Sequence, residues 1–401
     1  MSTAAPAQSI RDPRLDFFRG LAMFIILIAH VPGNWLTLWI PARFGFSDAT
    51  ETFVFCSGMA SAIAFGRAFR DQGMAIGTAR VGFRIWQVYW AHIGLFFAIA
   101  VTMVALNTFL PDPPRNYVGQ LNLTPFFRTP DVNLLGLMTL TYVPNYFDIL
   151  PMYLVILAMM PIMILLVRIH LFLGIAFSLA LWLGAQADIL AFPAEPWSER
   201  EWFFNPFGWQ LVFYTGFALM AGWFRPPPVT PWLIALAVAI ILLSLPFAYF
   251  RIYRAVEWAS ESRQEIAFFR AKTDFGLFRY IHFLATAYLA WVIAGPKGAR
   301  LIPKVATGLG LVWSRVLTVI LTVGQQSLAV FVASMYLARL MGVALDLLGR
   351  THLTMALVNI GGAGLIIAVA YTTRWFKAKP WSKRAAPQPA APPKTTAAPA
   401  E

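Results

Sequence analysis

The chain has 401 residues, of which 59% are hydrophobic and only 12% are charged. Its mean hydropathy is +0.65, whereas about a quarter of the residues in a soluble domain are charged. These proportions exclude a soluble enzyme, a disordered chain and a single-span anchor. They predict an integral membrane protein of all-α fold. The formal net charge of +13 therefore has to be divided between the two sides of a membrane before it indicates a partner.

The apolar segments predict a polytopic bundle of about ten transmembrane helices, since one crossing takes about 20 apolar residues. These segments begin near Phe17, Thr52, Ile85, Ile149, Leu171, Trp209, Pro231, Tyr280, Val316 and Thr354. Residues 134–142 form an apolar stretch too short to cross, and we expect a helix that lies on or dips into one face. Residues 251–279 mix acidic and basic side chains, which is typical of a solvated helix.

An even number of spans places both termini on the same side of the membrane. Most of the Lys and Arg residues fall on that side, so the positive-inside rule predicts cytoplasmic termini. The basic excess then reflects topology and contact with anionic membrane lipids, and we expect no nucleic-acid partner. The predicted parts are a cytoplasmic segment 1–13, a transmembrane domain 14–376 and a disordered Ala/Pro/Lys tail 377–401.

The first predicted span contains two ionisable residues, Arg19 and His30. They are separated by about three helical turns, or roughly 16 Å, and therefore share one helix face. Such a stripe resembles the two ends of a cleft entered from the cytoplasm, because ionisable groups in a hydrocarbon core usually face a cavity or find a partner. The alternative is a neutral histidine bonded to a neighbouring helix, with Arg19 reaching the headgroups.

The second predicted span opens with two acids, Asp48 and Glu51, on one helix face. They are candidates to act beside His30, or they simply cap the helix. Gly58 is expected to allow close helix packing. Cys56, the single cysteine, cannot form an intrachain disulfide and is expected to be buried filler rather than a nucleophile.

Four arginines, Arg67, Arg70, Arg80 and Arg84, follow in an expected cytoplasmic loop. The planar guanidinium suits phosphate, so this loop is a candidate seat for a nucleotide-bearing donor, although headgroup anchoring explains the same residues. The histidines outside the first span lie in separate segments, so we predict no metal site.

Further polar and aromatic residues gather at predicted span ends on the outer side, and one cluster lies inside the predicted ninth span. Rings edged with amides and carboxylates bind sugars, but they are equally the aromatic belt of any polytopic protein. The candidates for substrate binding are Asp148, Tyr153, Asn205, Trp209, Lys272, Asp274, Arg279, His282, Gln325 and Ser327.

Several blocks, taken together in this order, resemble the OpgC family, a branch of the acyltransferase-three membrane enzymes. The blocks are RLDFFRG at 14–20 leading to His30, FSDA at 46–49, FVFCSG at 53–58, DILPMY at 148–153, NPFGWQ at 205–210, KTD at 272–274 with Arg279 and His282, and GQQS at 324–327. The resemblance implies an acyl-CoA-dependent O-acyltransferase that moves a succinyl group from cytoplasmic succinyl-CoA to periplasmic glucan. Acyl-CoA would be a co-substrate, with no permanently bound cofactor. The resemblance also implies that the membrane is the plasma (inner) membrane.

The superfamily pattern of Arg-Gly followed by histidine falls on Arg19, Gly20 and His30, and its basic loop falls on Arg80 and Arg84. We therefore expect His30 to be the catalytic base, oriented by Asp48 or Glu51. The CoA phosphates would contact the inner arginines, and the pantetheine arm would rise from Arg19 to His30. The expected donor-binding residues are Arg14, Arg19, Arg67, Arg70, Arg80 and Arg84. The candidates to stabilise the oxyanion are Ser57, Gln325 and Ser327.

Two alternatives remain open. A transporter or flippase would use the same buried polar groups to line a permeation path, without chemical change in the substrate. An acyltransferase could also act on lipopolysaccharide sugars rather than on glucan. The acyl group and a possible homodimer are likewise left open.

Overall fold

The computed structural model of this protein describes residues 12–304 and 307–382. Within these ranges the regular structure is helical, apart from one isolated antiparallel bridge between Pro193 and Glu201. The all-α prediction is therefore confirmed for the described residues. The expected N-terminal segment and C-terminal tail fall mostly in residues 1–11 and 383–401, which lie outside that description.

Among the described residues, six helical runs are long and apolar enough to cross a membrane. They are Ala49–Phe109, which joins α2 to α3, then α6 (Ile149–Ile169), α9 (Pro231–Ala248), α12 (Leu277–Ala294), α14 (Ser327–Leu348) and α15 (His352–Lys377). Two shorter apolar helices are α7 (Leu171–Gln186) and α13 (Leu309–Gln325). The chain is thus a multi-pass membrane protein, while ten spans and cytoplasmic termini stay predictions.

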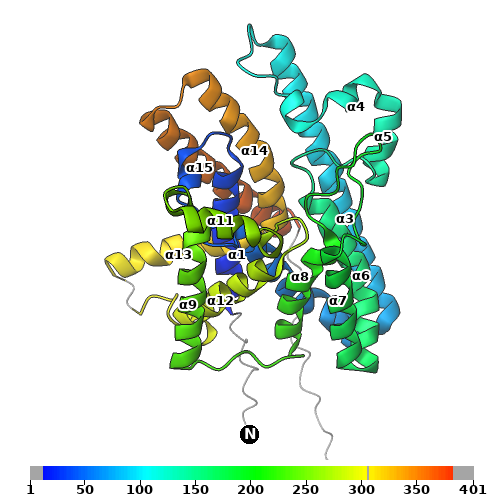
Figure 1. Cartoon of the computed structure of the whole chain (residues 1–401), viewed down its shortest axis with the longest axis vertical. Helices are drawn as coiled ribbons and strands as arrows, with labels where there is room; N and C mark the ends of the chain where they lie inside the picture. The colour runs from blue at the N-terminus through cyan, green and yellow to red at the C-terminus, as the bar shows by residue number, and fades with distance from the viewer. Residues whose placement is uncertain (1–11, 305–306, 383–401) are drawn as a thin grey trace, which may run out of the picture.

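Helix α1 (Pro13–His30) lies in the middle of the molecule, packed against α2, α13 and α14 (Figure 1). Its first half carries three charged residues, Arg14, Asp16 and Arg19, and α1 is not among the six runs above. Arg19 donates to Asp16 at 2.9 Å and to the carbonyl of Gly324 at 2.7 Å. The surrounding protein therefore satisfies a charge that lipid could not.

Helices α2 (Ala49–Ser61) and α3 (Arg67–Phe109) are joined by a π-helical turn, Ala62–Gly66. The predicted loop around the four arginines is wrong, because this stretch is helical apart from a break at Gly73. Gly73 has φ of 84°, a conformation open to glycine, so one residue is enough to redirect the chain.

Glycines allow α2 to pack closely against α8 (Pro206–Ala221). A Cβ added at Gly58 would lie 1.9 Å from the carbonyl oxygen of Phe213, and one at Gly216 would lie 2.3 Å from that of Phe55. The predicted packing role of Gly58 is confirmed.

The expectation that Gln325 and Ser327 lie inside one continuous helix, the predicted ninth span, is wrong. The chain breaks at Gln326, between α13 and α14, and Figure 1 shows α13 running across the view while α14 turns upward from it. The amides explain the break: Gln325 donates to Asp16 at 3.3 Å, and Gln326 accepts from Lys377 at 2.7 Å. These bonds satisfy the polar groups at the junction, whereas a continuous lipid-facing helix would expose those groups to lipid.

Short helices connect the long ones. The expected short helix is α5 (Pro130–Thr139), which begins earlier than predicted and follows α4 (Thr124–Arg128). The charged stretch at 251–279 is not one helix, because it divides into α10 (Phe250–Tyr253), α11 (Glu257–Glu265) and a 3-10 turn, η5 (Phe268–Arg270), before α12 begins. The other 3-10 turns are η1 (Trp35–Leu38), η2 (Pro41–Arg43), η4 (Gly119–Leu121) and η6 (Pro296–Gly298).

Candidate functional site

A cavity of about 400 Å³ lies where α1 ends and α2 begins, and we call it the His30 cavity. Four predicted site residues line it although they are far apart in the sequence: His30, Asp48, Asp148 and Lys272. Aromatic rings complete its wall, contributed by Tyr146, Phe203, Phe204 and Phe331. The hollow therefore combines a histidine, carboxylates, a cation and flat apolar surfaces.

His30 is the last residue of α1, and its ring is half-buried. Its Nδ1 lies 2.7 Å from the carbonyl oxygen of Ile26. Because a carbonyl oxygen only accepts, Nδ1 carries the proton of this bond, and the neutral ring keeps its lone pair on Nε2. The ring also meets Tyr146 edge to face, with 5.4 Å between centroids. Backbone and ring contacts thus fix both the tautomer and the orientation of a potential proton acceptor.

Asp48 and Glu51 lie at the start of α2 and form a cluster with Lys272 and Arg279, in which Glu51 and Arg279 are buried and Asp48 and Lys272 are half-buried. The Asp48 side chain accepts a backbone N–H of the first turn, and Glu51 accepts the N–H of Asp48 at 2.7 Å, which is a capping box. Lys272 lies 2.6 Å from Asp48, and Arg279 Nε lies 2.8 Å from Glu51. The capping interpretation is therefore confirmed.

The charge balance of this cluster keeps Asp48 ionised. Burial raises the pKa of Asp48, but the charges of Lys272 and Arg279 outweigh burial and hold the pKa well below its ordinary value. The hydrogen bonds described for Asp48 and Glu51 go to cations and backbone rather than to His30. Asp48 nevertheless lines the same cavity as His30, so its charge acts on the imidazole through space.

Asp148 precedes α6 on the opposite wall and is 4% exposed. Its Oδ1 accepts the backbone N–H of Phe203 at 3.0 Å. Burial raises the pKa of Asp148 to about 6, although the Phe203 N–H and the charge of Arg200 favour the carboxylate. The cavity wall therefore holds a carboxyl group whose pKa burial raises above its ordinary value.

Three of the predicted substrate-binding residues lie behind the cavity wall. Asn205 caps α8 and donates to Asp274 at 3.0 Å. Trp209 is fully buried, and its indole N–H donates to the carbonyl of Lys272 at 2.9 Å. Because these bonds fix the backbone next to Lys272, they position the cation that faces the cavity.

His282 lines a different cavity, a mostly apolar hollow of about 210 Å³. Its Nδ1 lies 2.7 Å from Ser47 Oγ, and a Cβ added at Gly45 would lie 2.1 Å from Nε2. Cys56 lines the same hollow and is buried, as expected of filler. This histidine is enclosed by packing rather than presented to the His30 cavity.

Arg14 also lines that apolar hollow and is held in place by the protein. Its guanidinium stacks 3.2 Å from the ring centroid of Trp291, and it donates to the carbonyl of Gly295 at 3.1 Å. Asp12 accepts from its Nε at 2.9 Å. The contacts described for Arg14 anchor the start of α1.

A second polar cavity, of about 260 Å³, lies further along α1 and α2, and we call it the Arg84 cavity. Its polar lining consists of Arg19, Ser57, Ser61, Arg84, Tyr153 and Ser327. Lys377 interacts electrostatically with Arg84 and Arg19, so the cationic character extends beyond the lining. Tyr153 and Ser327, which we expected beside the acceptor, are thus grouped with two arginines instead.

A stacked aromatic pair separates the two polar cavities. Phe53 lines the Arg84 cavity and Phe331 lines the His30 cavity, with their ring centroids 5.5 Å apart and their planes 13° from parallel. Ile149 lines both cavities. The predicted continuous cleft from Arg19 to His30 is therefore two hollows with a ring-thick barrier between them.

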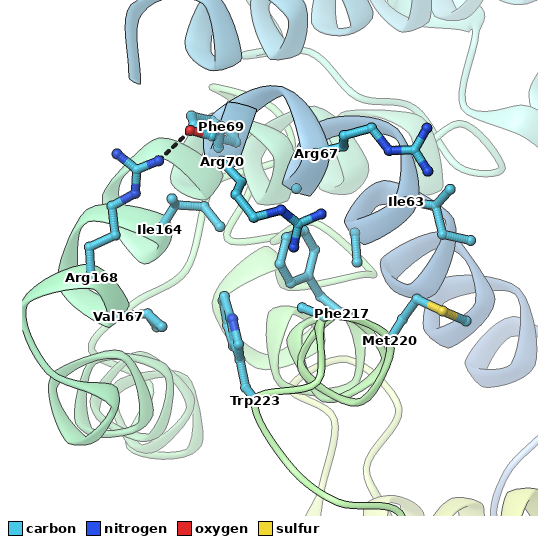
Figure 2. Close-up of a pocket in the computed structure, with 13 residues that line it drawn as sticks. Ile63, Arg67, Phe69, Arg70, Ile164, Val167, Arg168, Phe217, Met220 and Trp223 are labelled. Atoms are coloured by element: carbon cyan, nitrogen blue, oxygen red, sulfur yellow. Dashed lines mark hydrogen bonds between the residues drawn. The ribbon is translucent and has the colours of Figure 1, made fainter. Parts of the chain in front are cut away.

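The predicted donor-binding arginines do not form one site. Arg67 and Arg70 line a third cavity, of about 450 Å³, together with Arg168 (Figure 2), and we call it the Arg168 cavity. Arg80 lies exposed on α3, outside the lining of all three polar cavities.

Sequence reasoning missed Tyr146, Phe331 and Arg339. Tyr146 donates to the carbonyl of Met335 at 2.7 Å, and the guanidinium of Arg339 lies 3.8 Å from the Tyr146 ring centroid. Arg339 sits inside the apolar sequence of α14, and such an intramembrane cation was the available signal. No comparable signal distinguishes Phe331 from the many other apolar residues.

Comparison with known proteins gives one match. No curated protein and no solved structure matches the chain. The family described as OpgC protein matches residues 11–378, which is nearly the whole chain. The chain therefore belongs to the OpgC family, which indicates an acyltransferase-type function in a membrane.

Proposed function

We propose that this protein moves a succinyl group from cytoplasmic acyl-CoA to hydroxyl groups of a glucan on the periplasmic side of the inner membrane. The observation that carries the proposal is the pair of polar cavities along α1, one with arginines and one with His30, with the stacked rings of Phe53 and Phe331 between them. A transferase with a donor on one side and an acceptor on the other needs two such compartments that meet at the reacting atoms.

His30 is the general base of the proposed reaction. Nε2 accepts the proton of the acceptor hydroxyl as its oxygen attacks the thioester carbonyl carbon. The carbon–sulfur bond then breaks, the electron pair stays on sulfur, and the imidazolium returns the proton to the leaving thiolate. The products are an ester on the sugar and free CoA thiol. The bond from Nδ1 to Ile26 supports this role, since it leaves Nε2 as the acceptor.

Asp48 stabilises the imidazolium electrostatically in this scheme, because its carboxylate lines the same cavity. Glu51 acts indirectly in this scheme, because it positions Arg279 and the first turn of α2. We propose no metal and no resident cofactor in the reaction.

The donor occupies the Arg84 cavity in this scheme. Arg19 and Arg84 supply cations for CoA phosphates, and Ser57 and Ser327 supply hydroxyl groups along the pantetheine arm. Lys272, on the wall of the His30 cavity, suits an acyl group that ends in a carboxylate, which favours succinyl over acetyl. The aromatic wall of that cavity suits a sugar face.

The test uses purified protein with labelled succinyl-CoA and periplasmic glucan. His30→Ala is expected to abolish transfer above background, because no other described group of the His30 cavity offers a neutral imidazole. His170→Ala is the matched control, since His170 is exposed and precedes α7. Transfer by His30→Ala at the control rate would remove His30 from the mechanism. Transfer to lipopolysaccharide sugars instead of glucan would change the acceptor and leave the base in place.

A transporter is the second candidate, because two cavities divided by an aromatic barrier also describe a closed permeation path. Uptake of glucan into vesicles without CoA would support it. Ester formation that depends on CoA would exclude transport as the principal function.

Sedimentation of the purified protein at different concentrations tests whether it forms a homodimer.

A further inference from the structure

The Arg168 cavity is built from three helical segments and is strongly cationic. Arg67 and Arg70 come from the start of α3, Arg168 from the last turn of α6, and Trp223 from the residues after α8. The lining contains no Asp or Glu. Asp71, beside the lining, lies 3.4 Å from Arg70 in an exposed pair, which neutralises little of the charge.

The arginines line a cavity whose volume of about 450 Å³ can hold a phosphate group. Figure 2 shows Arg70 extending from α3 toward Phe217, Trp223 between Arg70 and Arg168, and the Arg168 guanidinium turned toward Phe69. Arg168 donates to the backbone carbonyl of Phe69, so one part of its guanidinium is fixed by the protein. Its other N–H groups remain for a ligand, since a guanidinium carries five.

The surroundings of the cavity are apolar and exposed. Ile63, on its rim, is 44% exposed, and Ile162 and Leu165 on α6 are 50% and 48% exposed. Helix α6 is among the runs apolar enough to cross a membrane, so lipid chains are the natural cover for these side chains. Trp223 also fits a membrane interface, where an amphipathic ring lies at headgroup level.

A phospholipid combines an anionic phosphate group, which suits the arginines of the cavity, with apolar chains, which suit the exposed apolar side chains around it. We propose that the Arg168 cavity binds the phosphate headgroup of an anionic phospholipid, with Arg70 and Arg168 on the phosphate and the acyl chains along Ile63 and α6. The cavity shares no lining residue with the His30 or Arg84 cavities. The site is therefore separate from the proposed reaction path and does not depend on that proposal.

The test is native mass spectrometry of the purified full chain in mixed micelles that contain phosphatidylglycerol and phosphatidylcholine. We expect wild-type protein to retain one phosphatidylglycerol molecule in preference to phosphatidylcholine. Arg70→Gln combined with Arg168→Gln should weaken this retention at least about tenfold, because two charge-assisted contacts to phosphate are lost. Arg225→Gln is the matched control, since Arg225 is an exposed cation outside the cavity lining, and it should retain lipid like the wild type.

Retention that is equal in the double variant and the wild type would overturn the proposal. Displacement of the retained lipid by equimolar CoA or by 3′,5′-ADP would also overturn it, because the cavity would then be a nucleotide site. Circular dichroism of the double variant shows whether its helices are intact, so loss of lipid can be separated from loss of fold.

Discussion

The charged residues that line the two polar cavities or lie beside them are held by ion pairs before any ligand binds. Arg279 pairs with Glu51, Lys272 pairs with Asp48, and Arg19 pairs with Asp16. A buried ion pair contributes little net stability compared with apolar packing, but removing one partner leaves a charge without compensation. The pairing therefore fixes the positions of these side chains, and the loss of one partner lowers the stability of the fold.

The substitution Glu51→Ala tests the cost of removing one partner of a buried ion pair. We expect it to lower the free energy of unfolding by about 3 kcal/mol, because Arg279 would remain buried with only the longer contact to Asp48, at 3.5 Å. Reversible denaturation in mixed micelles measures the change. Asp71→Ala is the control, since Asp71 pairs with Arg70 at the surface and should change the free energy by less than about 1 kcal/mol.

Equal effects of the two substitutions would contradict the buried-pair account. The double variant Glu51→Gln with Arg279→Met should recover much of the lost stability, since it removes both charges together.

At the scale of elements, the contact between α2 and α14 decides whether the two polar cavities communicate. Phe53 belongs to α2, and Phe331 belongs to α14 and is fully buried. Because protein interiors are close-packed, a stacked pair in this position excludes water as well as substrate. Passage between the cavities requires these rings to move.

Phe331→Leu is expected to raise hydrolysis of succinyl-CoA in the absence of glucan several-fold, because a smaller side chain lets water reach the thioester. Release of free CoA thiol measures this reaction. Phe96→Leu is the matched control, as Phe96 is equally buried but lies on α3 outside both cavities. If both variants hydrolyse the donor at the wild-type rate, Phe331 is not a barrier.

At the scale of the whole molecule, the proposed function requires the His30 cavity to be reached from the periplasm and the Arg84 cavity to be reached from the cytoplasm. Asn145 is exposed and lines the His30 cavity, and Arg225 is exposed after α8. Cys56 is buried at 4% exposure, so it gives little background for thiol labelling.

Single cysteines placed in a Cys56→Ala background test this arrangement. A membrane-impermeant maleimide should label Asn145→Cys in intact cells, whereas Arg225→Cys should react only after the membrane is broken. Labelling of both variants from the same side would contradict the proposed topology. Mass spectrometry of the intact protein quantifies the modification.

Local properties explain which expectations were correct. The capping role of Asp48 and Glu51, the close approach at Gly58 and the buried state of Cys56 depend on neighbours a few residues away or on apolar surroundings. The break at Gln326 was not predicted, because its amide is satisfied by Lys377, a residue that only folding brings near.

The sequence by itself determined that this is an all-helical membrane protein of the OpgC family, and it identified His30, Asp48, Asp148 and Lys272 as residues of interest. Apolar length, charge and motif order are properties of the linear chain, so they can be read without coordinates. Only the tertiary structure showed that the arginines line separate cavities, that Tyr153 lines the Arg84 cavity and that Phe331 stacks on Phe53. The rotation of each helix about its axis decides these contacts, and that rotation is set by packing against residues distant in the chain.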